Sequence, residues 1–196
     1  VVPSDPSSIA RIKIQGVDNG PGNNYTSLWS QSEFFRIAGV RVDSPNGGGS
    51  EPDWLLNRSE NIRWSYAEAG LSGAGELWIS YVGDTNYTMV KASQNFETKI
   101  LPYTPITPTV KGRVKIVATS PDVTNMLDIS DYDFTVVGLK MLLPTNGATY
   151  TLGQNIDDAI NWLSAGTKKT MANVYYSIPG QSLVTVIPGT VNADDA

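Results

Sequence analysis

The sequence predicts an all-β protein of two β-sandwich units, one complete and one split between the two ends of the chain. Three observations lead to this prediction. Short apolar segments alternate with turn residues at the spacing of a sandwich, segments of similar sequence recur at a fixed offset, and no segment keeps a long helical apolar period. Residues 40–138 form the complete unit, whereas residues 1–39 match only the end of a unit and residues 139–196 only its beginning.

The repeat is visible as matching segments that occur in the same order, at an offset of about 100 residues, which is the mark of an array. The matches are Arg11–Ile14 with Arg113–Ile116, Phe35–Gly39 with Phe134–Gly138, Ile62–Trp64 with Ile160–Trp162, and residues 77–92 with 174–189. Joined tail to head, the two end pieces make a second unit with almost nothing missing at the join.

Strands are predicted wherever β-branched and aromatic residues cluster between turn residues. In the complete unit they cover residues 40–42, 54–56, 62–65, 77–82, 87–90, 96–100, 114–118 and 134–137. Leu77, Ile79 and Tyr81 occupy alternate positions of one strand, so we expect them to face the core together. In the split unit, residues 155–164 come closest to a helical pattern but are predicted as a strand, because their equivalent reads as turn plus strand.

Composition excludes several classes of function. A net charge of −5 with only 14 Lys and Arg argues against nucleic acid, whose phosphates require clustered cations. The absence of Cys and His removes disulfides, thiolate metal sites and the commonest catalytic base. We expect neither a membrane span nor a signal peptide, since the chain has no long apolar run and no charged-then-apolar leader. The acidic make-up, rich in Thr, Ser and Asn, fits an extracellular or cell-surface setting.

The chain is predicted not to be an enzyme. A glycosidase needs two facing carboxylates, and neither repetition nor context singles out a pair among the 19 acidic residues. Ser and Thr are abundant, but without His or a Ser-x-x-Lys motif they have no activating base.

Several motifs resemble the immunoglobulin-like tandem repeats of large bacterial cell-surface proteins. The run Gly39–Gly48, followed by Trp54 and by Ile62-x-Trp64, is similar to their Pro-Asn-Gly-Gly turn, Trp and Ile-x-Trp signature. Ser130–Phe134 resembles their closing Ser-Asp-x-x-Phe strand, and Pro144–Gly147 their turn. The resemblance covers essentially the whole chain and implies tandem immunoglobulin-like sandwiches that serve as stalks, adhesins or scaffolds. Its motifs are turns and core aromatics, so it carries no catalytic residue.

Five tryptophans are candidates for the core or for contacts. Trp64 and Trp162 share one position, which resembles the third strand of an immunoglobulin sandwich, where a Trp packs in the core. Sugar stacking is the alternative for this pair. Trp29, Trp54 and Trp78 are predicted on exposed faces, in contacts between domains or subunits.

Scattered acidic residues are candidate calcium ligands, since Ca²⁺ takes about six to eight oxygen ligands. They are Asp128, Asp131 and Asp133, together with Asp157 and Asp158. None has the spacing of a dedicated calcium loop. Asn24, Asn57 and Asn86 begin glycosylation sequons, which arise often by chance in a chain rich in Asn and Thr.

The split unit suggests a function. Either half would leave open strand edges, and such edges invite pairing. We therefore expect an extracellular structural protein that forms a filament or surface array. Its partners would be other copies of itself, joined head to tail by strand complementation or as one longer covalent chain. The alternative classes are an adhesin or carbohydrate-binding stalk with a cell-surface or glycan ligand, and an accessory domain of an enzyme whose catalytic region lies elsewhere.

Overall fold

The protein is all-β. The computed structural model describes residues 5–17, 28–48, 51–67, 74–118, 126–151, 160–166, 171–177, 179–180, 182 and 184–192. Within these residues the chain forms sixteen strands and one short 3-10 turn, with no α-helix.

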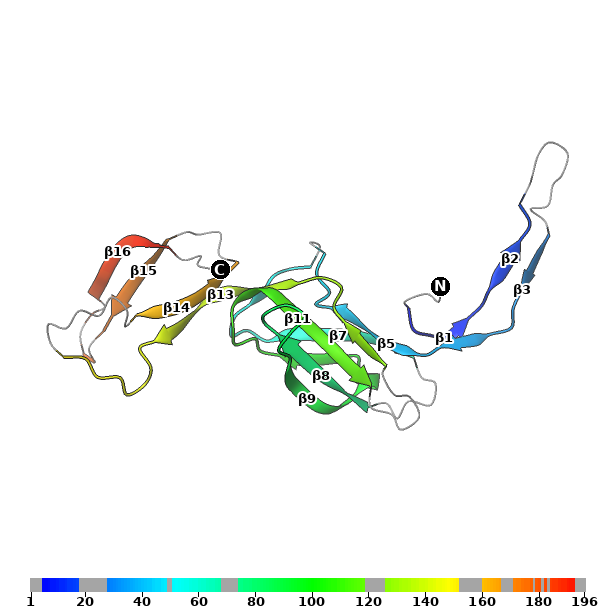
Figure 1. The fold of residues 1–196 in the computed structure, drawn as a ribbon, viewed down its shortest axis with the longest axis horizontal. Helices are drawn as coiled ribbons and strands as arrows, with labels where there is room; N and C mark the ends of the chain where they lie inside the picture. The colour runs from blue at the N-terminus through cyan, green and yellow to red at the C-terminus, as the bar shows by residue number, and fades with distance from the viewer. Residues whose placement is uncertain are drawn as a thin grey trace.

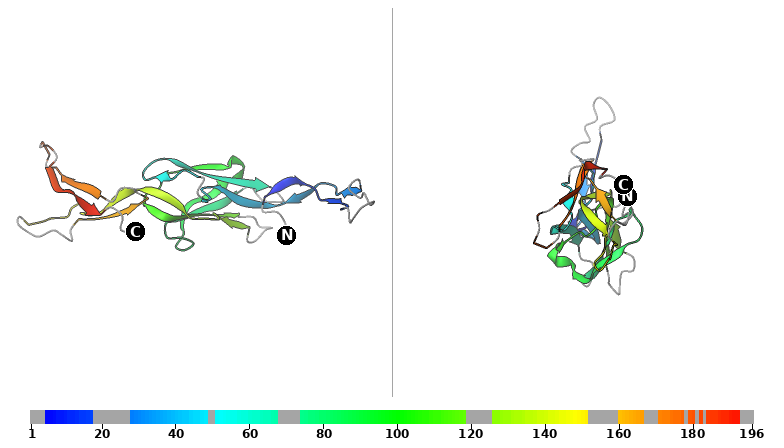
Figure 2. Two further views of the ribbon diagram at one scale, coloured as in Figure 1. Left: turned by 90° about the horizontal axis from the view of Figure 1, so that it is seen from above. Right: turned by 90° about the vertical axis from the view of Figure 1, so that its left-hand side faces the viewer.

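The molecule is elongated, with a β-sandwich in the middle and a smaller group of strands at each end (Figures 1 and 2). We call these the N-terminal and C-terminal strand groups. The N-terminal group contains β1 (Ser7–Ala10), β2 (Lys13–Gln15), β3 (Trp29–Gln31) and β4 (Phe35–Ile37). The C-terminal group contains β14 (Asn161–Ala165), β15 (Met171–Tyr176) and β16 (Val184–Asn192).

Two sheets form the central sandwich. One has the order β10-β7-β5, with β5 at Gly39–Ser44, β7 at Glu60–Ala67 and β10 at Ile100–Tyr103. The other runs β13-β11-β8-β9, with β8 at Ala74–Ser80, β9 at Thr88–Asn95, β11 at Thr109–Ala118 and β13 at Phe134–Leu143. Two short strands extend this second sheet: β12 (Leu127–Ile129) pairs with β11, and β6 (Trp54–Leu55) pairs with β13 in parallel. All other pairs in the sandwich are antiparallel.

Alternate side chains of the facing strands fill the space between the sheets, as the period of two along a strand requires. Trp64 and Phe96 are the largest fully buried residues, and their rings meet edge to face with centroids 5.9 Å apart. The Trp64 indole N–H also donates a 2.9 Å hydrogen bond to the Phe96 carbonyl. This bond satisfies the polar edge of a ring that is otherwise enclosed by apolar atoms.

Most of the expected strands exist, but one is wrong. Residues 96–100 were predicted as a strand, whereas Phe96–Thr98 form a 3-10 turn and the next strand begins at Ile100. The Asn95 side chain caps this turn by accepting from the Glu97 N–H at 2.9 Å. Of the predicted strand 155–164, residues 161–164 belong to β14 and residues 155–159 lie outside the described residues.

Strand β13 links the sandwich to the C-terminal group without a loop. Its first half pairs with β11 and its second half pairs with β14, from Gly138 opposite Ala165 to Leu143 opposite Asn161. Figure 1 shows the strand leaving the sandwich toward β14. The chain therefore passes from one strand group to the next inside a hydrogen-bonded sheet.

Close packing at Gly75 gives a first prediction. A Cβ added there would collide with the Phe96 ring and lie 2.5 Å from the Val117 carbonyl oxygen. Because the Phe96 ring is fully buried, we expect Gly75→Ala to lower the free energy of unfolding in urea by about 1–3 kcal/mol. In the control Gly39→Ala, the new Cβ comes no closer than 3.8 Å to Pro6, so stability should not fall. An unchanged urea midpoint for Gly75→Ala would contradict the packing described.

Candidate functional site

The N-terminal strand group exposes apolar side chains at positions where the matching residues of the sandwich are buried. Ile12 and Ile14 are 58% and 71% exposed, whereas Val114 and Ile116, which match them in sequence, are both 0% exposed. In the sandwich these two residues of β11 point between the sheets. The corresponding face of β2 has no such cover in the described part of the chain.

The hydrogen bonds around β2 repeat those around β11. The Ser32 N–H donates to the Ile12 carbonyl at 2.9 Å, and the Ser130 N–H donates to the Val114 carbonyl at 2.9 Å. Each serine hydroxyl oxygen also accepts from the partner backbone, Ser32 from the Ile12 N–H at 2.9 Å and Ser130 from the Val114 N–H at 3.1 Å. Strands β2 and β3 thus have the local geometry of β11 and β12.

Strands β1 and β4 likewise repeat a pairing of the sandwich. Ser7 lies opposite Ile37 and Ala10 opposite Phe35, with an irregularity between the two pairs. In the sandwich, β11 and β13 pair in the same way, and the corresponding positions are Thr109 with Val136 and Gly112 with Phe134, again with an irregularity between them.

Strand pairings in the C-terminal strand group correspond to pairings of β5, β7, β8 and β9. Gly138 and Met141 lie opposite Ala165 and Trp162, as Gly39 and Val42 lie opposite Ala67 and Trp64. The β15–β16 hairpin also resembles β8–β9. Register shifts fall between Ala172 and Val174 and between Val174 and Tyr175, at the positions that match the shifts of β8 between Gly75 and Leu77 and between Leu77 and Trp78.

One difference separates the strand groups from the sandwich. Strand β8 pairs with β9 on one edge and β11 on the other, whereas β15 pairs only with β16 among the described residues. Similarly, β11 pairs with both β12 and β8 along Lys115–Val117, whereas β2 pairs only with β3 in the same part of the structure. We call the remaining edge of β2 at Lys13 and Ile14, and the remaining edge of β15, the open edges.

A polar pocket of about 300 Å³ lies at one end of the sandwich, lined by Arg41, Val42, Asp43, Asn46, Asp128 and Asp131. The Arg41 guanidinium donates to Asp43 Oδ1 from Nε at 2.9 Å and Nη2 at 2.8 Å. Asp128 Oδ2 accepts from the Val42 N–H at 2.7 Å. Burial raises the pKa of Asp128 above its ordinary value of 3.8, although hydrogen bonds from the Val42 and Ile129 backbone oppose the shift.

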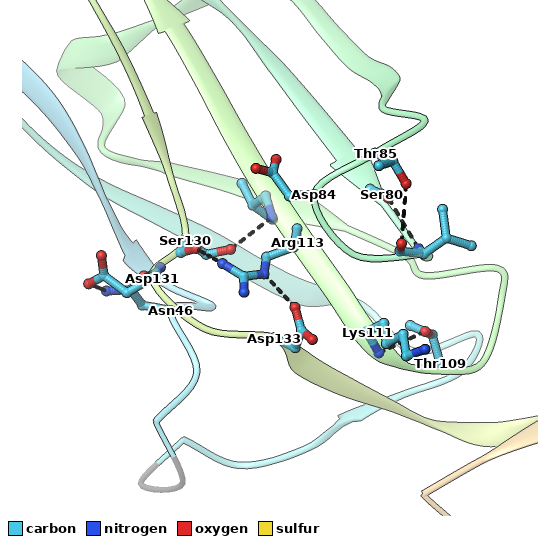
Figure 3. A network of polar contacts seen from close by, with 12 residues as sticks. Asn46, Ser80, Asp84, Thr85, Thr109, Lys111, Arg113, Ser130, Asp131 and Asp133 are labelled. Atoms are coloured by element: carbon cyan, nitrogen blue, oxygen red, sulfur yellow. Dashed lines mark hydrogen bonds and ion pairs between the residues drawn. The ribbon is translucent and has the colours of Figure 1, made fainter. Parts of the chain in front are cut away.

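Protein donors engage the described acidic residues that were candidate calcium ligands. Asp131 Oδ2 accepts from the Asn46 amide at 2.9 Å, and Asp133 pairs with Arg113, which also donates to the Ser130 carbonyl (Figure 3). Asp133 does not line the pocket. Asp157 and Asp158 lie outside the described residues. No group of three or more His, Cys, Asp or Glu in the described part of the chain is placed to hold a metal ion.

The prediction for the tryptophans is wrong at Trp54. Trp54 was predicted to be exposed, but it is only 5% exposed, with its ring 4.7 Å from that of Phe134 and 6.4 Å from that of Tyr103. The parallel pairing of β6 with β13 carries its side chain inward. Trp64 is 1% exposed, Trp162 and Trp78 are half-buried, and Trp29 is 59% exposed.

Two of the three sequon asparagines lie at exposed turns. Asn57 and Asn86 have φ of 62° and 49°, in the left-handed region that Asn tolerates better than most residues. This backbone geometry explains the choice of Asn at both positions. Asn24 lies outside the described residues.

In comparisons with known proteins, no sequence family, no curated protein and no solved structure matches the chain. Among the described residues, no helix is long and apolar enough to cross a membrane.

The raised pKa of Asp128 gives a prediction about pH. The folded protein holds the proton of this carboxyl more tightly than the unfolded chain, so its ionisation costs stability as the pH rises from about 3.8 through the folded pKa. We expect Asp128→Asn, which keeps an oxygen to accept from Val42, to gain free energy of unfolding relative to the wild type over that pH range. Urea titrations at several pH values measure the difference.

Asp53→Asn is the control for this experiment, because it removes the same charge at an exposed position. A constant difference between Asp128→Asn and the wild type at all pH values would contradict the expected ionisation cost.

Proposed function

We propose that this protein is a structural element of an extracellular filament or surface array of stacked immunoglobulin-like domains. The N-terminal strand group of one copy and the C-terminal strand group of the next complete a second sandwich between them. The observation that carries this proposal is the exposure of Ile12 and Ile14, whose counterparts Val114 and Ile116 are fully buried.

The paired registers support a tandem repeat. Strands β1–β4 contain the pairings made by β11, β12 and β13, and strands β13–β16 contain those made by β5, β7, β8 and β9. The two strand groups therefore supply complementary parts of one sandwich rather than two versions of the same part. The resemblance of the turn and Ile-x-Trp motifs to bacterial surface repeats favours the immunoglobulin-like class.

Joining the two strand groups would be favourable in free energy. Burying one exposed Ile side chain contributes about 1.5–3 kcal/mol, and the N-terminal group offers Ile12 and Ile14, both more than half exposed, at the positions of the buried Val114 and Ile116. Pairing two open edges would also satisfy backbone donors and acceptors along both strands. A joint made of these two parts would yield both gains at once.

The geometry favours a filament over a closed ring. The two strand groups extend from opposite ends of the sandwich (Figure 2). A contact between different surfaces of successive copies continues without limit unless the rotation closes. The partners are therefore other copies of the same chain, joined head to tail as separate subunits or within one longer polypeptide. The acidic composition, rich in Thr, Ser and Asn, supports an extracellular or cell-surface location.

Negative-stain microscopy and light scattering of the purified chain test the proposal. We expect filaments whose repeat corresponds to two sandwiches, and we expect them in calcium as well as in chelator if the strands alone make the joint. Loss of filaments in chelator would assign a metal to the joint. A monodisperse monomer at every concentration would contradict completion between separate copies.

A single charge on β2 should block assembly. Replacing Ile14 with Asp removes about 1.5–3 kcal/mol of apolar burial and adds a buried charge, so we expect the critical concentration for assembly to rise more than about tenfold. Thermal unfolding of the sandwich should not change, because Ile14 lies outside its core. Sedimentation measures the assembled fraction.

Leu127→Asp is the matched control, since Leu127 is 51% exposed on β12 and belongs to the sandwich rather than to either open edge. Assembly of Ile14→Asp at the wild-type concentration would argue against the joint.

A further inference from the structure

We infer that β2 of one copy adds to the open edge of β15 of a second copy, antiparallel and with Lys13 opposite Tyr175. The two copies would then form a continuous sheet in the order β3-β2-β15-β16. This inference rests on the proposed function, and it specifies which strands meet and in which register.

The sandwich provides the template for this sheet. There the corresponding strands run in the order β12-β11-β8-β9, with Lys115 opposite Trp78 and Ile116 opposite Leu77. Lys13 and Ile14 match Lys115 and Ile116, whereas Tyr175 and Val174 match Trp78 and Leu77 in the ungapped alignment of residues 77–92 with 174–189. Transferring the register places Lys13 opposite Tyr175 and Ile14 opposite Val174.

The inner face of the new sheet would be apolar. Val114, Ile116, Leu77 and Ile79 are all at most 1% exposed on the inner face of β11 and β8. Ile12 and Ile14 take the places of Val114 and Ile116 on β2. A slip of one residue would turn both isoleucines outward, because neighbouring side chains of a strand point to opposite faces. The apolar pattern therefore selects this register over its nearest neighbours.

The outer face offers a second match, between Lys13 and the aromatic residue that takes the place of Trp78. Lys115 Nζ lies 5.3 Å from the centroid of the Trp78 ring and 4.3 Å from that of the Tyr87 ring, so one cation serves two aromatic rings. Lys13 Nζ already lies 5.4 Å from the centroid of the Trp29 ring. Tyr175, which is 51% exposed, would bring the second ring to Lys13 across the joint.

The occupant of each open edge is a second copy rather than the same chain folded back. Within one chain the sandwich lies between the two strand groups (Figures 1 and 2). Strand β13 enters the C-terminal group as a continuous strand, and β5 follows β4 after a single residue at the other end. Neither connection has the loop that a return of β2 to β15 would need.

Disulfide formation between introduced cysteines tests the register, since the chain has no Cys of its own. Directly opposed residues of antiparallel strands have Cβ atoms about 4.5–5.5 Å apart, close to the separation that a disulfide requires. We expect assembled Lys13→Cys/Tyr175→Cys protein, after oxidation, to give a ladder of covalent multimers on a non-reducing gel. Mixing the two single variants should give a dimer and no ladder, which shows that the bond joins different chains.

Lys13→Cys/Asn173→Cys is the matched control. Residue 173 is two positions before residue 175 along β15, a diagonal position at which residues of antiparallel strands are about 7–8 Å apart, so we expect about tenfold less cross-linking. Filaments that cross-link through position 173 instead of 175 would overturn the register and leave the proposed function standing. Absence of filaments from the wild-type chain would overturn the inferred pairing between separate copies, and it would leave the covalent tandem chain as the remaining form of the proposed function.

Hydrogen exchange of the wild-type chain provides a measurement that needs no substitution. Amides of β2 and β15 should exchange more slowly in filaments than in dissociated chains, and those of β11 should not change. If filaments form while β2 and β15 exchange as fast as in free chains, the inferred pairing is wrong and the filament is held by another surface.

Discussion

Pairing of both edges and covering of one face stabilise the inner strands of a sandwich, and the proposed assembly depends on this constraint. Strand β11 meets it, because it pairs with β8 on one edge and with β12 and β13 in turn on the other, and its alternate side chains are buried. Strand β2 has nearly the same sequence and the same hydrogen bonds to its neighbour, but one open edge and two exposed isoleucines. The proposed assembly would give β2 the second paired edge and the buried apolar face that β11 already has.

The sequence was informative where the chemistry is local. The alternation of Leu77 and Ile79 predicted the inward face of β8, and both residues are buried. The 3-10 turn at Phe96–Thr98 was missed because Phe96 and Ile100, at the two ends of residues 96–100, are residue types that favour strands. The features that form the turn, the Asn95 cap and the positive φ of Lys99, each involve a single residue and leave no periodic pattern. Trp54 was misplaced because its burial depends on a parallel pairing with a strand about eighty residues away, which periodicity does not reveal.

The polar pocket could not be predicted from the sequence, for a similar reason. Its residues come from two short segments, one around Arg41 and Asn46 and one around Asp128 and Asp131, which only the packing of β5 against β12 brings together. Sequence reasoning identified the two aspartates as possible ligands but not their hydrogen-bond donors. Through those donors, Asp128 joins β12 to β5, and Asp131 joins the following turn to Asn46.

The continuity of β13 has a mechanical consequence. When the two ends of the molecule are pulled apart, tension passes along the backbone of β13 from the sandwich into the C-terminal strand group, with no flexible linker to extend first. The hydrogen bonds to β11 and β14 lie across the direction of pull, so they resist as a group in shear instead of opening one after another like a zipper. A chain of such units would behave as a stiff rod under load, with its first yield at whichever ladder has the fewest bonds in parallel.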